Sequence, residues 1–572
     1  MRTRWLRGLA PVLVLAVAAV LRFWALDRPS TLVFDELYYV RDAISQLAHG
    51  FPTTWPDDDP DMSGARATAF SDDPSNAVHP PLGKWLIGLG ILAFGPGNGW
   101  GWRSAVALAG VLTVAVTMRL TWRMSRNLLV ACTAGLLLAI DGVHVTLTRV
   151  GLLDGFLTLA VTVGALFVWR DIEQTADRAS AQTSDPYALP SPLTEVPGQA
   201  LAPRIEWRRP WLLAAAVAFG AAAAIKWSGL YPLAAFLLFI TVRDLVLRLR
   251  ASPARGIAEP RPGSELRAVW RATGRAMVQG LVTAAIALPV AFVTYLASWI
   301  GWILHPGGWS RTEGAPWFES LAVYHADMLR WHSTLSAEHP YAAHPLTWPL
   351  ALRPTGMYEV HWDASEGCPW RACAAEVASI PNPLITWAGV LAIIALACVV
   401  VFRLRRGPSP IGTVSAFIVV GYLSGWLPWV LTFSRSAVFQ FYAVVLTPFS
   451  AMALAIALAL LCRIPLRPRL ASVVQHGSGH NETARARQSS RDPENVASAP
   501  FVPDAVALQV VSPEAVTTNT TDVPESVAGT RIAVALFLAF AVALSLVYFP
   551  LWSGMPVAEW FWSAHLWLPG WK

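Results

Sequence analysis

Two neighbouring carboxylates, Asp35 and Glu36 in FDELYYVRDA, directly follow the first apolar segment of this 572-residue sequence. Beside apolar residues a carboxyl group can have a raised pKa, and such a group can take a proton from a hydroxyl nucleophile. The same pair could also belong to a solvated loop in which one acid caps a helix. Because two adjacent charges at a membrane surface are costly unless solvated or paired, we consider Asp35 and Glu36 candidates for general-base catalysis.

Several cations lie beside apolar segments, where the phosphate of a lipid would lie. A departing phosphate develops negative charge, which fixed cationic donors stabilise in a low-dielectric site. Each cation could instead extend its charged end to the head groups without binding a substrate. The candidates for binding a phosphate are His79 and Lys84 in VHPPLGKWL, Arg103 in GWRSAVALAG, Lys226 in IKWSG and Arg435 in FSRSAVFQFY.

Asp141, Arg149 and Asp154 lie where two successive apolar segments meet, in AIDGVHVTLTRVGLLDGFL. Ionisable residues at the ends of membrane segments are functional candidates by default, although these three could simply pair with one another. We therefore add them to the candidate donor-binding residues.

A long polar connector is rich in Trp, His, Tyr and Pro, which form platforms for sugars and peptides or anchor a chain in head groups. Its candidates for acceptor binding are His339, Tyr341 and Arg353. Its histidines match no zinc signature, so no metal is assigned, and a divalent cation is neither required nor excluded. Cys368 and Cys373 are compatible with a local disulfide and with two free thiols alike.

The elements that position these residues are membrane helices, because 55% of the sequence is hydrophobic and 14% is charged, against about 25% charged in soluble domains. About eleven segments are apolar enough to span a bilayer. They lie near 9–26, 103–122, 128–147, 151–169, 211–225, 228–242, 277–304, 383–402, 411–432, 437–462 and 531–551. Residues 82–94 are shorter and Gly-rich, and form a re-entrant or interfacial helix or a span.

Arginine-rich connectors give the orientation, because positive loops stay in the cytoplasm. A cytoplasmic N-terminus with an uncleaved first helix puts the Arg clusters inside. It puts the loop of Asp35, the turn before Asp154 and the loop 305–381 together outside. The net charge of +6 is explained by these inner loops and predicts no nucleic-acid partner.

The predicted organisation follows from the spans and their connectors. Residues 171–207 and 464–530 are rich in Ser, Thr, Pro, Ala and Glu without apolar periodicity and are expected to be disordered cytoplasmic connectors. The remaining parts are an N-terminal membrane module (1–170) with a catalytic external loop (27–102), membrane helices (208–304 and 382–463), a large external loop (305–381), and a last helix with an external C-terminus (531–572).

Taken together and in this order, the motifs resemble the protein O-mannosyltransferases that use dolichyl or polyprenyl phosphate mannose, in their actinobacterial branch. These motifs are FDELYYVRDA, HPPLGK, the Asp141–Arg149–LLDG series, KWSGLY, and HPY followed by HPLTWPLALRP. The resemblance implies an all-α, GT-C type membrane glycosyltransferase with about eleven helices and extracytoplasmic catalytic loops. It makes Asp35 the general base, Glu36 a positioning residue and Arg103 a ligand of the donor phosphate, while Asp141, Arg149 and Asp154 shape the cavity.

The resemblance also implies the reaction and its partners. One mannose would pass, with inversion, from polyprenyl-phosphate-mannose to Ser or Thr hydroxyls of secreted proteins at the cell membrane, with coupling to the secretion channel plausible. The chain departs from eukaryotic members because the loop 305–381, in which we find no strand periodicity, is too short for their β-trefoil domain.

Two other functions are compatible with many spans and charged residues. A GT-C relative that glycosylates a lipid or glycan would share the acidic first loop, but is not expected to share HPPLGK together with HPLTWPLALRP. A transporter or flippase would show internal repeats with broken helices near the bilayer centre, and the sequence shows no such repeat.

Overall fold

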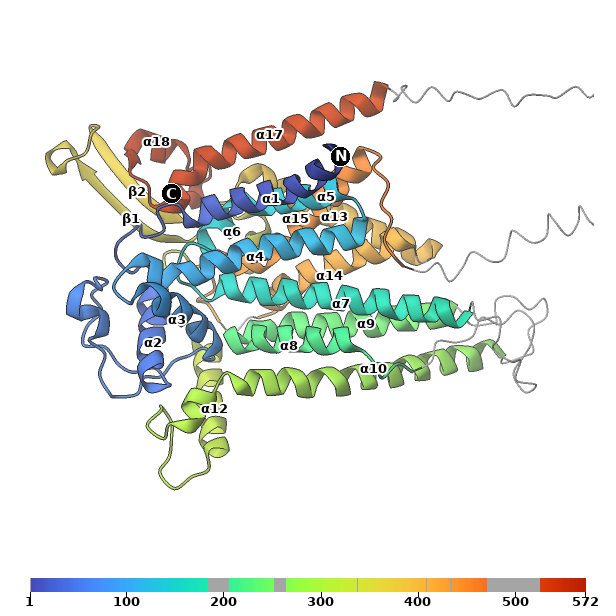
Figure 1. Ribbon diagram of the computed structural model, residues 1–572, viewed down its shortest axis with the longest axis horizontal. Coiled ribbons are helices and arrows are strands. Elements are labelled where there is room, and N and C mark those ends of the chain that lie inside the picture. The colour runs from blue at the N-terminus through green and yellow to red at the C-terminus, as the bar shows by residue number, and fades with distance from the viewer. Residues whose placement is uncertain are drawn as a thin grey trace, which may run out of the picture.

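The computed structural model describes residues 2–183, 205–250, 264–336, 338–407, 409–432, 435–470 and 525–572. Its long helices lie side by side along one axis, and shorter elements gather at one end, which we call the loop-bearing end (Figure 1). The long helices are α1 (Arg2–Phe23), α4 (Gly99–Ser125), α5 (Leu128–Ala139), α7 (Asp154–Thr183), α8 (Pro210–Ile225), α9 (Leu230–Arg250), α10 (Ser264–Ala297), α13 (Pro383–Arg406), α14 (Pro410–Val430), α15 (Thr447–Leu461) and α17 (Glu525–Ser553).

The loop-bearing end carries the short elements (Figure 1). These are α2 (Glu36–His49), α3 (Leu82–Phe94), α6 (Gly142–Leu147), α11 (Ile300–Leu304), α12 (Trp317–Thr334), α18 (Glu559–Ala564), β1 (Gly356–Asp363), β2 (Ala372–Ala378) and β3 (Val557–Ala558). This end therefore brings together segments from both halves of the chain.

Among the described residues, eight helices are long and apolar enough to cross a membrane: α4, α7, α9, α10, α13, α14, α15 with its leading turn, and α17. The helices α1, α5 and α8 contain shorter apolar stretches and run alongside them. The chain is thus a multi-pass membrane protein, and about eleven spans remains a prediction. The 13 residues of α3 extend about 20 Å, less than the bilayer core of about 30 Å.

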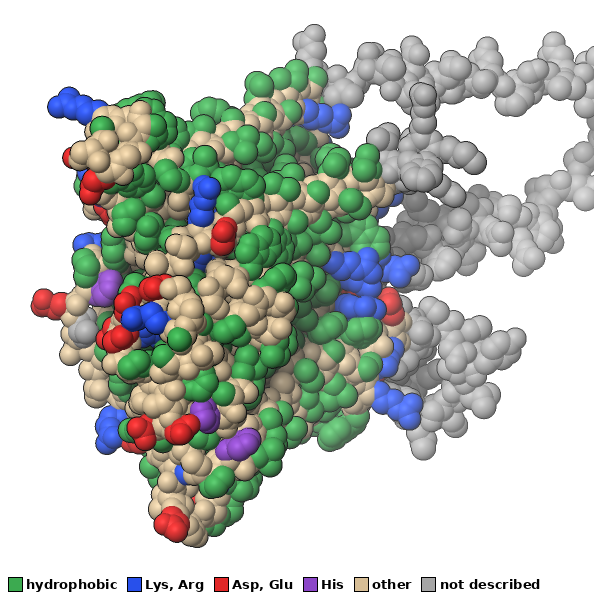
Figure 2. Space-filling model, turned by 60° about the vertical axis from the view of Figure 1, so that its left-hand side comes forward, with side chains coloured by type: hydrophobic (Ala, Val, Ile, Leu, Met, Phe, Trp, Pro, Cys, Tyr) green, Lys and Arg blue, Asp and Glu red, His purple; other side chains and the backbone are tan. Residues whose placement is uncertain are grey.

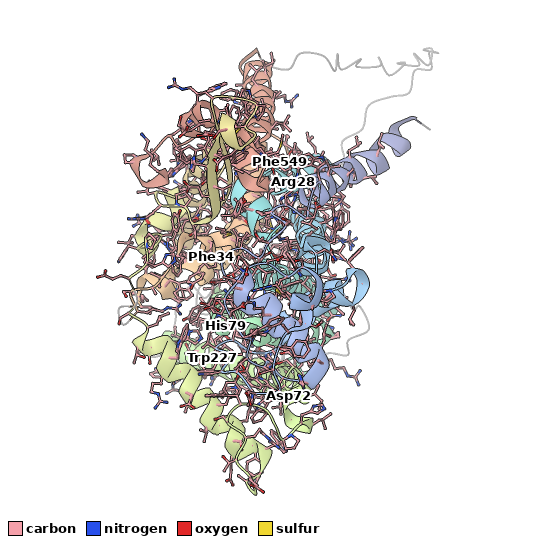
Figure 3. All side chains as sticks on the ribbon, turned by 90° about the vertical axis from the view of Figure 1, so that its left-hand side faces the viewer. Arg28, Phe34, Asp72, His79, Trp227 and Phe549 are labelled. Atoms are coloured by element: carbon pink, nitrogen blue, oxygen red, sulfur yellow. A yellow bond between two sulfur atoms is a disulfide. The ribbon has the colours of Figure 1, made fainter. Side chains whose placement is uncertain are left out.

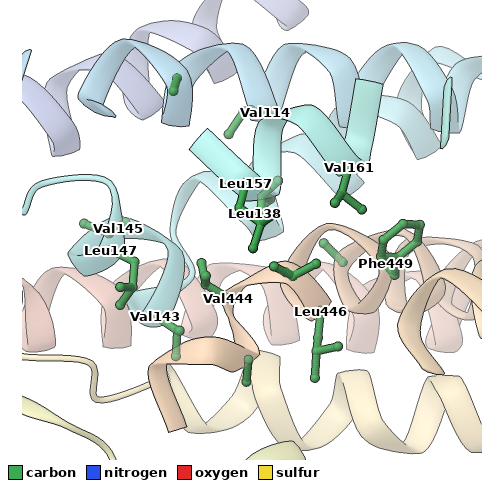
Figure 4. Close-up of a cluster of buried hydrophobic side chains, with 14 of the residues drawn as sticks. Val114, Leu138, Val143, Val145, Leu147, Leu157, Val161, Val444, Leu446 and Phe449 are labelled. Carbon is green, nitrogen blue, oxygen red and sulfur yellow. The ribbon is translucent and has the colours of Figure 1, made fainter. Parts of the chain in front are cut away.

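The interior of the bundle is made by α4, α5, α7 and α15 together with the turn that precedes α15. Figure 4 shows Val114, Leu138, Leu157, Val161 and Phe449 directed toward one another from these helices, and all five are buried. Each such side chain stabilises the packed state through the surface and dispersion contacts it gains. The interior thereby holds the helix ends that form the site in fixed relative positions.

Opposite the loop-bearing end, basic side chains are gathered. Figure 2 shows Lys and Arg side chains clustered at the right-hand end and Asp and Glu side chains mainly at the left. At the basic end Arg123 and Arg126 both pair with Glu173, and Arg209 pairs with Asp171. This asymmetry is the one that the positive-inside rule produces.

The predicted disordered connectors are shorter than expected. The helix α7 continues to Thr183 and α17 begins at Glu525, so residues 171–183 and 525–530 are helical. Extending an existing helix adds hydrogen bonds without a new nucleation step, so polar residues can follow an apolar span in helical form. Residues 205–207 and 464–470 are described without helix or strand, and 184–204 and 471–524 lie outside the described residues.

The large loop 305–381 contains strands, contrary to the expectation from its sequence. The strands β1 and β2 form an antiparallel hairpin, and β3, from the C-terminal segment, pairs with β2 to give the order β1-β2-β3. The periodicity was hidden because β2 reads ACAAEVA, in which Glu376 is the only charged residue, every residue but the first is buried, and alanine has little strand preference. A disulfide joins Cys368 and Cys373 across the hairpin, with 5.7 Å between their Cα atoms.

Candidate active site

A break between α8 and α9 places Lys226 at the loop-bearing end of the bundle. The helix α8 ends at Ile225, Lys226 takes an extended backbone conformation, and a short 3-10 turn leads into α9. Its amine donates to the Asp154 carboxylate, the first residue of α7, at 2.6 Å. One helix break and one helix start thus bring together two residues that are far apart in the sequence.

Asp35 stands at the first turn of α2 but does not cap it, because its side chain makes no bond to the helix backbone. Its Oδ2 instead accepts a hydrogen bond from Tyr39 Oη at 3.3 Å. The preceding residue, Phe34, has a left-handed backbone with φ of 49°, which is unfavourable for a bulky side chain. Its ring packs edge-on against His339, Phe439 and Phe441. These ring contacts hold Asp35 in place.

A cavity of about 230 Å³ is lined by Asp154, Lys226 and Arg435, and Asp35, although not itself among the lining residues, interacts electrostatically with all three. Figure 3 looks onto the loop-bearing end, where Phe34, His79 and Trp227 follow one another near the middle of the molecule. Apolar and aromatic side chains supply much of the lining, and the ionisable groups that line it are His79, Asp154, Lys226, Tyr231, His332, Arg435 and Tyr442. A single hollow therefore combines two cations with flat apolar walls.

The electrostatics of Asp35 come from the same cavity. The pKa of Asp35 is raised to about 6: burial raises it most, the nearby Lys226 lowers it, Asp154 raises it, and the hydrogen bond from Tyr39 and the charge of Arg435 lower it. The group is thus mostly ionised at pH 7, yet more basic than an ordinary aspartate. A carboxylate with these properties is suited to removing a proton from a hydroxyl group.

Arg435 is aimed at the cavity by two side chains. Its guanidinium donates to the Ala437 carbonyl (2.8 Å), to Tyr442 Oη (3.2 Å) and to His332 Nδ1 (3.2 Å). The other ring nitrogen of His332 lies 2.8 Å from the Val78 carbonyl, so it carries the proton and Nδ1 is the acceptor. Burial lowers the pKa of His332 to about 4, which keeps the ring neutral. Among the described residues, three of the five N–H donors of Arg435 have an acceptor, and two remain.

Arg103 and Glu36 do not reach this cavity, contrary to the roles predicted for them. Glu36 accepts four hydrogen bonds, two from Arg103 (2.7 and 2.8 Å), one from Val33 N (2.9 Å) and one from Gly151 N (2.6 Å). The remaining three N–H groups of Arg103 donate to the carbonyls of three residues of the first loop, Leu26, Pro29 and Thr31. Both side chains are almost fully buried, at 1% and 0% exposed. Arg103 therefore has no donor left for a phosphate, and the pair anchors the first loop.

Three more predicted donor-binding residues are also used within the protein. Arg149 donates to four carbonyls at the end of α1 and just after it, and Lys84 bonds to the His79 carbonyl (3.0 Å) and pairs with Asp42 (3.3 Å). Asp141 caps α6 by accepting from His144 N at 2.8 Å. None of the three lines the main cavity. His79, Asp154, Lys226 and Arg435, by contrast, all line it.

None of the predicted acceptor-binding residues lines this cavity. The His339 ring packs on Phe34 and Phe439, and Tyr341 packs on His339. Arg353 is exposed and donates to the Pro340 carbonyl at 2.6 Å. His339 and Tyr341 thus adjoin the residue before Asp35, whereas Arg353 braces the loop.

Sequence reasoning missed His332 and the aromatic walls as parts of the site. Trp227 Nε1 donates to Tyr295 Oη at 3.1 Å, and that hydroxyl lies 2.6 Å from His325 Nε2, so α10 and α12 fix the indole wall. The i to i+7 spacing of His325 and His332 on one face of an amphipathic helix was an available signal. Among the described residues, no three His, Cys, Asp or Glu side chains are grouped to hold a metal ion.

Comparison with known proteins supports one family. Residues 80–184 match the family model described as dolichyl-phosphate-mannose-protein mannosyltransferase, and residues 317–489 match that of the C-terminal four-transmembrane region of protein O-mannosyltransferase. A polyprenol-phosphate-mannose–protein mannosyltransferase of Mycobacterium tuberculosis is 29% identical over 98% of this chain and 91% of its own length. The enzyme of that name from Corynebacterium glutamicum is 28% identical over 78% of this chain and 81% of its own.

A solved structure shares the fold. The Saccharomyces cerevisiae protein O-mannosyltransferase complex Pmt1-Pmt2, bound to the sugar donor, aligns with a TM-score of 0.61 at 13% identity, covering 99% of this chain and 92% of the other. The fold is thus of the GT-C type, as expected from the sequence. With both family models and relatives of nearly full length in agreement, the chain belongs to the protein O-mannosyltransferase family of membrane glycosyltransferases.

Proposed function

We propose that this protein transfers one mannose from polyprenyl-phosphate-mannose to Ser or Thr hydroxyl groups of polypeptides, and that Asp35 is the general base. The observation that carries the proposal is the placement of Asp35 beside a cavity lined by Lys226 and Arg435. A base for the acceptor and cations for the leaving group are both needed, and this cavity has both.

The chemistry follows from these groups. Asp35 takes the proton of the acceptor hydroxyl while its oxygen attacks the anomeric carbon of mannose, and the bond from that carbon to the phosphate oxygen breaks. Attack from the face opposite the phosphate inverts the configuration without a covalent sugar–enzyme intermediate. The lipid phosphate leaves as an anion, so no general acid is required.

The phosphate would lie between Lys226 and Arg435. Lys226 uses one of its three N–H donors on Asp154, and Arg435 keeps two of five free. The Lys226 amine also lies 5.2 Å from the ring centre of Tyr442, whose electrons stabilise a cation. His332 acts as a positioning residue, because its neutral Nδ1 orients the Arg435 guanidinium.

The orientation of the bundle supports a site on the outer face of the cell membrane. The basic side chains gather at the end opposite the cavity, and positive ends stay in the cytoplasm. Acceptors would then be secreted proteins, modified before they fold, which would favour coupling to the secretion channel.

A reconstitution tests the function directly. The purified full chain in nanodiscs receives polyprenyl-phosphate-mannose and a peptide with a single Thr, and the peptide is analysed by mass spectrometry. Mannose should appear on the Thr, and should be absent with a Thr→Ala peptide or with the Asp35→Asn enzyme. Mannose on a lipid or glycan acceptor alone, or redistribution of the lipid between leaflets without transfer, would overturn the proposal.

A further inference from the structure

The free edge of β1 offers backbone groups to an extended chain. In an antiparallel sheet each residue turns its N–H and C=O to one side, and the side alternates along the strand. The Glu376 carbonyl in β2 accepts from Gly554 N at 3.1 Å, on the side of β2 that faces β3. Its register partner in β1 is Glu359. Glu359 therefore turns its own N–H and C=O away from β2, and His361, two residues on, does the same.

These edge groups are open to a partner. Within the described part of the chain, the backbone groups of Glu359 and His361 bond to no other element. The side chains of Glu359 and His361 are each 39% exposed. One face of the sheet is covered by the C-terminal segment, where Trp562 Nε1 donates to the Glu376 carboxylate at 2.6 Å. Nothing among the described residues pairs with the edge itself, and unpaired edges of this kind pair readily with extended chains.

The edge is continuous with the active site. Gly356, the first residue of β1, lies directly against the Tyr341 side chain. Tyr341 packs on His339, and His339 packs on Phe34, with ring centres 6.0 and 6.2 Å apart. Phe34 immediately precedes Asp35. The rings of Tyr341, His339 and Phe34 thus connect the start of β1 to Asp35, and a chain paired with β1 could extend along them.

We propose that the polypeptide acceptor binds by adding a strand to the edge of β1, through the backbone groups of Glu359 and His361. This inference rests on the proposed function and names how its acceptor is held. Strand addition reads the main chain, which all unfolded polypeptides share, and places little demand on side chains. It therefore suits an enzyme that must modify Ser or Thr in many sequences, and it requires that the acceptor be unfolded.

The sharpest experiment leaves the protein unchanged and alters the peptide. Two acceptor peptides are N-methylated at alternate residues, one in the odd and one in the even register relative to the Thr. Because only every second N–H of an added strand faces β1, one register should raise the peptide KM by about tenfold more than the other. Equal effects of the two registers on the KM of a peptide that is still mannosylated would overturn the strand.

A substitution tests the same edge from the enzyme. His361→Pro removes the edge N–H, which an edge strand tolerates, and should raise the peptide KM at least about fivefold above that of His361→Ala, which keeps it. The donor KM of both variants should stay near that of the native chain, which shows that the site is formed. Val360→Ala, whose backbone faces β2, is the control. Equal peptide KM values for the Pro and Ala variants would overturn the inference, whereas absence of mannose transfer to any peptide would instead overturn the proposed function.

Discussion

Asp35 and Glu36 are neighbours in the chain, yet their carboxylates lie in two different surroundings. Glu36 is enclosed with Arg103, and every donor and acceptor of the pair is used within the protein. Asp35 accepts one hydrogen bond, from Tyr39, and lies beside a cavity whose cations keep free donors. The comparison teaches that an ionisable residue is available for chemistry only when hydrogen-bonding capacity is left over after folding. Substitutions around Asp35 should therefore change the rate of the reaction. Substitutions around Glu36 should change the stability of the folded protein.

The largest effect is expected at the base. Asp35→Asn keeps the shape and removes the charge, so transfer should fall by about 10²- to 10⁴-fold, measured as the initial rate of peptide mannosylation. The variant should still bind the donor, because the cations that we propose to hold the phosphate are untouched. Near-normal turnover of Asp35→Asn would show that Asp35 is not the general base, and the contrast between Asp35 and Glu36 would then not hold.

At the enclosed pair the loss should be one of stability. Arg103→Ala leaves a buried carboxylate without its cation, which costs about 3 to 5 kcal/mol, and thermal inactivation of the purified protein should occur at a lower temperature. Arg353→Ala is the matched control, because that arginine is exposed and makes one hydrogen bond. If Arg103→Ala kept normal thermal stability and only raised the donor KM, Arg103 would be a phosphate ligand after all.

A smaller effect is expected at Arg435, where a substitution should impair use of the donor but not of the acceptor peptide. Arg435→Ala removes the two free N–H donors at the cavity and should lower kcat/KM for the donor by about 10- to 100-fold, while the peptide KM changes little. Arg435→Lys should recover part of the loss, because it restores the charge without the fork of N–H groups. An equal rise in both KM values would place Arg435 outside the phosphate site.

The smallest effect is a pH profile. The active form of Asp35 is the carboxylate, and because its pKa is raised to about 6, kcat/KM should fall as the pH drops through that value. At pH 5 the activity should be about one tenth of the plateau, whereas a base with an ordinary aspartate pKa would keep most of it. Lys226→Gln removes a charge that lowers this pKa, so the acid limb should move to higher pH. A limb near pH 4 in the native enzyme would contradict the assignment.

Much of the fold could be predicted, because apolar length and arginine-rich connectors follow from bilayer physics alone. Most expected spans coincide with helices, for example α13 and α14. The site could be predicted only in part. Asp35, Lys226 and Arg435 were candidates, but so were Arg103 and Arg149, since the sequence names donors without showing which carbonyls and carboxylates use them. That information exists only once distant segments pack, as when Arg103 and Gly151 meet Glu36. The hairpin was missed because an alanine-rich strand buried on both faces has no alternating pattern.

The left-handed backbone of Phe34 has one further consequence. Glycine at position 34 would adopt this positive φ without strain. It would also leave the Asp35 carboxylate free to change its direction, because no ring would hold the backbone in place. With phenylalanine, the torsional strain is balanced by three neighbouring rings, and the direction of Asp35 is set before either substrate arrives. Binding then removes little conformational entropy from the loop. The binding free energy can therefore serve to align the hydroxyl with the sugar rather than to order the enzyme.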